Sequence, residues 1–134
     1  MRIRNLMFAI VPLAGLLGGC LVAAAGAGAG GAVYVTERDA EATLPASVAA
    51  VEASAKRTFG EMGITEKRTI AEEGSGGLKR TLEGTLDDRD ISVAIQTAGT
   101  GAKVVVAARK TPVTWDKDLA KKILEKIVEG AKQG

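Results

Sequence analysis

The side chain with the clearest chemistry in this 134-residue sequence is the thiol of Cys20, the only cysteine. A single cysteine excludes a disulfide within the chain, and the sequence contains no histidine. A transition-metal site would therefore have to be built from carboxylates alone. The thiol is also the only strong nucleophile of its region, so the residues before it decide which chemistry we expect.

The residues before Cys20 have the pattern of an export signal. Arg2 and Arg4 form a short positive start, and residues 6–16 are an apolar run of the length expected for a signal peptide. The stretch 1–19 is therefore predicted to be a signal peptide, entering the membrane as a signal helix.

The four residues Leu17, Gly18, Gly19 and Cys20 resemble the lipobox of bacterial lipoproteins. That motif has an aliphatic residue three positions before the cysteine and small residues between them. The resemblance implies that lipoprotein signal peptidase recognises Leu17, Gly18 and Gly19 and cuts before Cys20. It also implies that the Cys20 thiol carries a diacylglyceryl group, with acyl chains such as palmitate. Two or more acyl chains anchor a protein stably.

The residue after Cys20 is Leu21 rather than aspartate. By resemblance to the sorting rule of Gram-negative lipoproteins, this predicts a lipid anchor in the outer membrane with the protein facing the periplasm. The expected location is the bacterial cell envelope, and the first partner is the membrane itself.

Residues 20–33 are rich in alanine and glycine and are predicted to be a flexible tether behind the lipidated cysteine. The alternative is a signal anchor, because no charged residue lies between Arg4 and Glu37, and about 20 apolar residues span a bilayer. Each glycine costs a helix about 1 kcal/mol relative to alanine, which disfavours a continuous span over 6–35. Residues 34–134 are left as one globular domain.

The charge of the globular part excludes one class of partner. The chain has 18 basic and 16 acidic residues, and only Arg2 and Arg4 lie before Cys20, so 16 basic residues face 16 acidic ones after it. A neutral domain with one Trp and one Tyr lacks both the basic field and the stacking platform that nucleic acids require. Nucleic-acid binding is therefore not expected.

The first elements of the domain are read from their periodicity. Ala40, Ala42 and Leu44 alternate with polar residues and predict a half-buried strand, which Pro45 ends. Pro45 also suits the first turn of a helix. Apolar residues then follow at helical spacing, namely Val48, Val51, Ala55, Phe59 and Met62. Gly63 is the expected helix end.

Four strands and a second helix are predicted after Gly63. The strands are Ile64–Glu72, Leu78–Leu86, 91–96 and Lys103–Arg109, and their short turns indicate an antiparallel meander. Asp116 or Thr114 is expected to cap the closing helix, whose apolar stripe runs through 119–128. The predicted fold is α+β, with an antiparallel sheet of about five strands, both helices packed on one face and the order β-α-β-β-β-β-α.

This pattern is similar to that of an uncharacterised family of small bacterial lipoproteins, defined only as a domain of unknown function. The shared features are the Gly/Ala tether, a strand containing Tyr34, the Leu44-Pro45 strand end, a helix and a meander. At the turn before the central strand, this chain has 87–90 (Asp-Asp-Arg-Asp) in place of the commoner Asp-Gly. The resemblance supplies no functional residues.

The serines and the acidic clusters are candidate catalytic or metal-binding groups, and neither candidate is favoured. No serine has a Ser-x-x-Lys motif, so Ser47, Ser54, Ser75 and Ser92 are interpreted as surface and turn residues. The acidic pairs at 72–73 and 87–90 could do acid–base work or bind Ca²⁺, but a solvated turn is the favoured interpretation. No catalytic residue, metal or cofactor is expected.

Two further features are candidate contact residues. Four lysines of the closing helix could touch anionic lipid head groups, although an ordinary solvent-exposed face is favoured; they are Lys117, Lys121, Lys122 and Lys126. Trp115 is expected to pack over the start of that helix, and the alternative is an exposed contact residue.

Together these observations predict a non-enzymatic, lipid-anchored envelope protein with a structural or binding surface, for which another envelope protein is a candidate partner. The alternatives are a small-ligand or lipid-binding module using the space between sheet and helices, a signal-anchored membrane protein with the same domain, and, last, a hydrolase. The sequence leaves the oligomeric state open.

Overall fold

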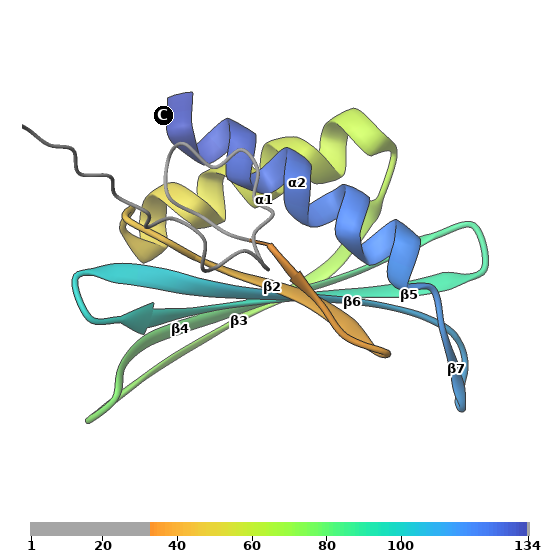
Figure 1. The fold of residues 1–134 in the computed structure, drawn as a ribbon, viewed down its shortest axis with the longest axis horizontal. Helices are drawn as coiled ribbons and strands as arrows, with labels where there is room; N and C mark the ends of the chain where they lie inside the picture. Colours follow the sequence, from red (N-terminus) through yellow and green to blue (C-terminus); the bar gives the residue numbers. More distant parts are fainter. Residues whose placement is uncertain (1–32, 134) are drawn as a thin grey trace, which may run out of the picture.

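The computed structural model describes residues 33–133, and the predicted signal peptide, Cys20 and nearly all of the predicted tether lie outside them. The elements, in chain order, are β1 (Tyr34–Val35), β2 (Asp39–Leu44), α1 (Val48–Met62), β3 (Thr65–Gly74), β4 (Gly77–Leu86), β5 (Arg89–Ala98), β6 (Gly101–Thr111), β7 (Thr114–Trp115) and α2 (Lys117–Gln133). The predicted α+β fold is confirmed: one antiparallel sheet carries both helices on the same face (Figure 1).

The sheet has the strand order β1-β2-β6-β5-β4-β3, and β7 pairs with β6 off this path. Strands β3 to β6 form the predicted meander, while β2 pairs with β6 and so brings the start of the domain beside its last long strand. The sheet has seven strands rather than about five because β1 and β7 are strands of only two residues. The two outer edges are the short β1 and the ten-residue β3.

Helix α1 begins later than Pro45 suggested. The side chain of Ser47 accepts a hydrogen bond from the Ala50 amide and caps the helix, so Pro45 lies outside the first turn. Gly63 ends α1 as predicted, with a positive φ of 76°. The Ile64 amide donates to the Phe59 carbonyl, as in a Schellman motif.

Helix α2 begins after its N-terminal cap, Asp116, which is one of the two predicted capping residues. Asp116 caps through its side chain. Its Oδ1 accepts a hydrogen bond from the Leu119 amide at 3.0 Å. Helices α1 and α2 pack against each other, and their contact includes the buried hydroxyl of Ser54, which donates to the Ile127 carbonyl at 2.7 Å. Gly130 permits this approach, because a Cβ there would overlap Ser54 Oγ.

The core fills the space between the sheet and the helices. Its largest fully buried side chains come from β4, β5, β6, α1 and α2, and they include Leu82, Ile91, Ile95, Val104, Val51, Ile123 and Leu124. Within residues 33–133, no helix has the length and apolar character needed to cross a membrane.

The opposite face of the sheet carries no helix (Figure 1). In a strand, successive side chains alternate between faces, so the residues between the core positions point to this uncovered face. Its centre is lined by small half-buried residues, among them Ser92 and Ala94 on β5 and Val105 and Ala107 on β6. Charged residues surround this centre.

Candidate functional site

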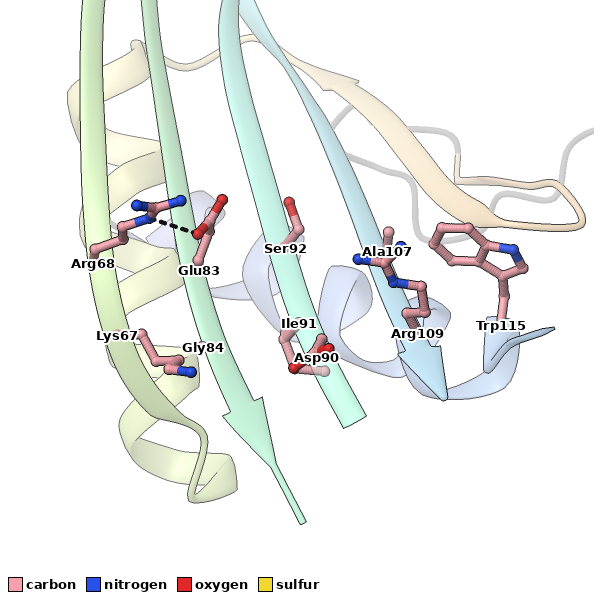
Figure 2. A pocket seen from close by; sticks show the side chains of 10 residues that line it. All are labelled: Lys67, Arg68, Glu83, Gly84, Asp90, Ile91, Ser92, Ala107, Arg109 and Trp115. Carbon is pink, nitrogen blue, oxygen red and sulfur yellow. Dashed lines mark hydrogen bonds and ion pairs between the residues drawn. The ribbon is translucent and has the colours of Figure 1, made fainter. Parts of the chain in front are cut away.

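A hollow of about 530 Å³ lies on the uncovered face of the sheet, near the end where β6 meets β7. Figure 2 shows its lining, with Arg68 and Lys67 of β3 on one side and Arg109 and Trp115 on the other. Ser92 and Ala107 form the floor between the two sides. Ligand sites in proteins have volumes of roughly 300–1,000 Å³, so the hollow is large enough for a ligand or a peptide segment.

Two arginines flank the only tryptophan of the chain. The guanidinium carbons of Arg38 and Arg109 lie 5.7 and 5.4 Å from the centroid of the Trp115 ring. Arg109 and Trp115 are direct partners in the β6–β7 ladder, so their side chains share one face of the sheet. The stacking holds each guanidinium in place while its N–H groups stay able to bind a carboxylate.

Two threonine-centred turns bring these three residues together. Thr36 Oγ1 accepts hydrogen bonds from the amides of Arg38 and Asp39 in the turn between β1 and β2. Thr111 Oγ1 accepts in the same way from the amides of Val113 and Thr114, at 3.2 and 3.1 Å. The second turn reverses the chain after β6 and places Trp115 beside that strand. Such turns form locally because a hydroxyl satisfies amides that lack a ladder partner.

The far side of the hollow is an ion pair between neighbouring strands. Arg68 Nε donates to Glu83 Oε1 at 2.7 Å, and the two residues are direct partners in the β3–β4 ladder. Strands in a sheet lie about 4.8 Å apart, so the three strand spacings from β3 to β6 separate the two sides by roughly 14 Å. The hollow therefore runs across the strands.

The charge of the hollow is basic on balance. Its lining has three cations, Lys67, Arg68 and Arg109, and two carboxylates, Glu83 and Asp90, and Arg38 adds a cation beside Trp115. Glu83 is paired with Arg68, whereas the two arginines beside Trp115 face one carboxylate of the lining, Asp90, the ladder partner of Arg109, so that side keeps a net positive charge. The arrangement suits binding of a carboxylate next to an aromatic or apolar group.

The predicted lipidation site and its recognition residues, Leu17, Gly18, Gly19 and Cys20, lie outside the described residues. The four lysines of α2 that are candidate lipid contacts, Lys117, Lys121, Lys122 and Lys126, are all exposed. Lys121 lies 3.8 Å from Glu125, and Lys126 lies 3.3 Å from Glu61. Two of the four lysines are thus paired with carboxylates, which reduces the net positive field of this helix face.

The four serines lie in different parts of the domain. Ser47 caps α1, Ser75 is in the β3–β4 turn, and Ser92 is the one serine in the hollow. The surface interpretation of Ser54 was wrong, because its hydroxyl is buried between the two helices and donates to the Ile127 carbonyl. Within the part of the chain that the structure describes, no three acidic or cysteine side chains are grouped so that they could hold a metal ion.

The acidic turn before β5 has a structural contact. Arg89 donates to Asp116 Oδ2 at 2.9 Å, tying the β4–β5 turn to the start of α2, and it also pairs with Asp88. The Arg89 hydrogen bond, helped by the Leu119 amide, lowers the pKa of the Asp116 carboxyl. The same bond raises the pKa of Arg89.

The favoured prediction, that Trp115 packs over the start of α2, was wrong. The residue belongs to β7 and lies on the uncovered face between two arginines, rather than over the start of α2, because the turn at Thr111 folds the chain back onto β6. Sequence reasoning did not select Arg38 or Arg109. The alternation along β6, which puts Ala107 and Arg109 on one face, was the available signal.

No protein-family model matches this chain, and no curated protein sequence matches it either. The resemblance to a family of small bacterial lipoproteins stays a prediction. The case for a function therefore depends on the residues and on the geometry of the hollow.

Proposed function

We propose that this chain is a lipid-anchored protein of the bacterial cell envelope whose domain binds an acidic segment of another envelope protein, without catalysing a reaction. The anchor is the diacylglyceryl group on Cys20, and the binding surface is the hollow beside Trp115. The outer membrane, facing the periplasm, is the proposed location.

The anchor is supported by the sequence of the first 32 residues. A positive start, an apolar run and the residues Leu17 to Cys20 follow one another in the order and spacing of a lipoprotein signal. Residues 21–32 contain no charged side chain, which suits a linker between a membrane and a folded domain.

The observation that carries the binding proposal is the stack of Arg38 and Arg109 on Trp115 at the side of the hollow. An aromatic ring and arginines in one concave surface are the residue types most enriched at the centres of protein interfaces. Because the available charge there is positive, the complementary partner is acidic. A non-enzymatic role is favoured because Ser92, the only serine in the hollow, has no histidine in the chain to activate it.

The anchor is tested by the intact mass of the protein from the membrane fraction. We expect a chain that begins at Cys20 and is heavier by its acyl groups, and Cys20→Ala should abolish both the cleavage and the added mass. An uncut chain beginning at Met1 without lipid would instead support the signal anchor.

The binding surface is tested with the full chain and a glutamate-rich peptide as probe. Trp115 is the only tryptophan, so its fluorescence reports directly on the hollow. We expect a saturable change in Trp115 fluorescence as peptide is added, and an affinity for the peptide that falls as the salt concentration increases. Arg109→Ala should weaken binding by about tenfold, since charge-assisted hydrogen bonds contribute about 1.5 kcal/mol.

The matched control for Arg109→Ala is Lys103→Ala. Lys103 is a cation of the same strand and the same face, but it is paired with Glu41 and lies outside the hollow. An equal loss of affinity in both variants would show only general charge attraction and would overturn the hollow as the binding site. Capture of envelope proteins with wild type and Arg109→Ala as bait then identifies the natural partner.

A further inference from the structure

The outer edge of β3 is a free strand edge of ten residues. It ends the sheet, and in the described part of the chain its only strand partner is β4. Its side chains are exposed except for Thr69 and Ile70, which are half-buried. Strand edges of this length present unpaired N–H and C=O groups that can pair with another strand.

The ladder inside the sheet determines which residues of β3 offer these groups. The Leu78 amide donates to Thr97 Oγ1 and the Leu78 carbonyl accepts from the same hydroxyl, so the backbone of Leu78 points toward β5. Backbone direction alternates along a strand, so Lys79 points toward β3 and its partner Glu72 points back toward β4. The outward-pointing residues of β3 are therefore Thr69, Ala71 and Glu73.

The charges of β3 are divided between its two halves. The first half is basic on balance, because it carries Lys67 and Arg68 together with Glu66, which pairs with Lys56 of α1, and Glu72 and Glu73 make the second half acidic. Two antiparallel copies of this strand place the basic half of each opposite the acidic half of the other. A parallel pairing in register would place like charges together, which is unfavourable.

One register satisfies both the backbone and the charges. A two-fold axis through Ile70 pairs Thr69 with Ala71, both outward-pointing, so each pair exchanges two backbone hydrogen bonds. The same register places Arg68 opposite Glu72, and Ile70 opposite its own copy in a pair without backbone hydrogen bonds.

The two neighbouring registers place less compatible side chains opposite each other. A shift of the axis to Thr69 places Arg68 opposite Ile70, a charge facing an apolar side chain, and the β3–β4 ladder is irregular before Arg68. A shift to Ala71 places Ile70 opposite Glu72 and leaves Arg68 facing a glycine. Only the Ile70 axis gives an apolar centre with opposite charges on both sides.

We propose that two copies of this chain associate through β3, antiparallel and with their two-fold axis at Ile70, so that the two sheets continue as one. An interface that uses the same strand on both subunits is self-complementary and closed, so it stops at a dimer. The interface shares Lys67 and Arg68 with the far side of the hollow, whereas Trp115 and Arg109 do not lie on β3, so Arg109→Ala tests the binding surface without changing the proposed interface.

Charge exchange tests the register with the full chain carrying two different affinity tags in one cell. One variant is Lys67→Glu with Arg68→Glu, which makes the strand acidic, and the other is Glu72→Lys with Glu73→Lys, which makes it basic. We expect differently tagged wild-type copies to co-purify, each variant to lose this pairing with itself, and the two variants to recover it with each other.

A matched control changes a charge one strand further in. Lys79→Gln removes a charge from the uncovered face of β4 without placing a like charge opposite its ladder partner Glu72, and it should leave co-purification unchanged. If the two exchanged variants pair no better with each other than with themselves, the proposal is overturned. Circular dichroism of each variant establishes that its sheet is intact.

Disulfide trapping tests the axis itself. Residues facing each other in an antiparallel pair without backbone hydrogen bonds have Cα atoms about 4.5 Å apart, which is within reach of a disulfide. We expect Ile70→Cys to form a cross-linked dimer under mild oxidation. Thr81→Cys, the partner of Ile70 on β4, and wild type, whose only thiol is Cys20, should not. Equal cross-linking in all three proteins would overturn the proposal.

Discussion

Ser54 of α1 donates its hydroxyl proton to the carbonyl oxygen of Ile127 in α2, at 2.7 Å and almost without contact with solvent. This hydrogen bond links the two helices, and Gly130 lies next to it. A buried hydrogen bond of this kind contributes about 1 kcal/mol. Ser54→Ala should lower the free energy of unfolding by that amount, measured by urea denaturation.

Gly130→Ala should have opposite effects in two backgrounds. In wild type the new Cβ overlaps Ser54 Oγ, so the hydroxyl must move and its bond to Ile127 is lost. In the Ser54→Ala background the nearest remaining atom is the Cβ at position 54, 3.5 Å away, an ordinary contact. Alanine should then stabilise α2 by up to about 1 kcal/mol. Additive effects in this double-mutant cycle would contradict the contact.

The ion pair between Arg89 and Asp116 predicts a pH-dependent stability. The pKa of Asp116 is lowered in the folded protein, so its contribution is present above the unfolded pKa of about 3.9 and is lost as pH falls through the folded value. Asp116→Asn keeps a helix-capping oxygen but removes the charge. The variant should have a lower Tm than wild type at neutral pH, and the difference should shrink below about pH 4.

Asp118→Asn is the control for that measurement, since Asp118 lies in the first turn of the same helix. Both variants lose one favourable charge at the helix N-terminus. A pH-dependent Tm difference of the same size in both would assign the effect to the helix dipole and not to Arg89.

Two glycines should respond to alanine in opposite directions. Gly60 lies inside α1 and a Cβ there meets nothing within 4 Å, so Gly60→Ala should raise the free energy of unfolding by up to about 1 kcal/mol. Gly84 of β4 is buried, and a Cβ there would lie 2.5 Å from the Thr65 carbonyl oxygen and 3.1 Å from the Phe59 ring. Gly84→Ala should cost about 1–3 kcal/mol, because the backbone of β3 cannot move without breaking its ladder.

The arginines beside Trp115 should shield its ring from solvent. Arg38→Ala and Arg109→Ala should each increase quenching of the tryptophan fluorescence by acrylamide. Each should also lower the free energy of unfolding by about 0.5–1 kcal/mol, the contribution of an exposed cation–π contact. Arg57→Ala, in the exposed part of α1, should leave the quenching unchanged.

Most of the fold could be predicted because periodicity is a local property. The alternation of Ala40, Ala42 and Leu44 and the apolar stripe of α2 each follow from which residues must avoid water, and both are confirmed. The pairing of β2 with β6 was not predicted. It joins strands about sixty residues apart, and no local pattern in either strand specifies its partner.

The candidate site could be predicted only in part. Trp115 stands out as the single tryptophan, but its neighbour Arg38 reaches it from about 77 positions earlier in the chain. Their meeting depends on two turns and on the β2–β6 pairing together. The start of α1 also depends on a local hydrogen bond. The Ser47 hydroxyl accepts from the Ala50 amide and caps the helix, so Pro45 lies before its first turn.

The strand order has a consequence for how firmly the protein would stay on a membrane. Val33, where the described chain begins, leads into β1, at the sheet edge opposite β3. In two copies joined at β3, eleven inter-strand distances of about 4.8 Å separate one β1 from the other, roughly 50 Å across the shared sheet. If each copy carries the lipid proposed on Cys20, the pair has two membrane anchors. Such a pair leaves the bilayer only when both lipids detach together, so its residence time would greatly exceed that of a single copy.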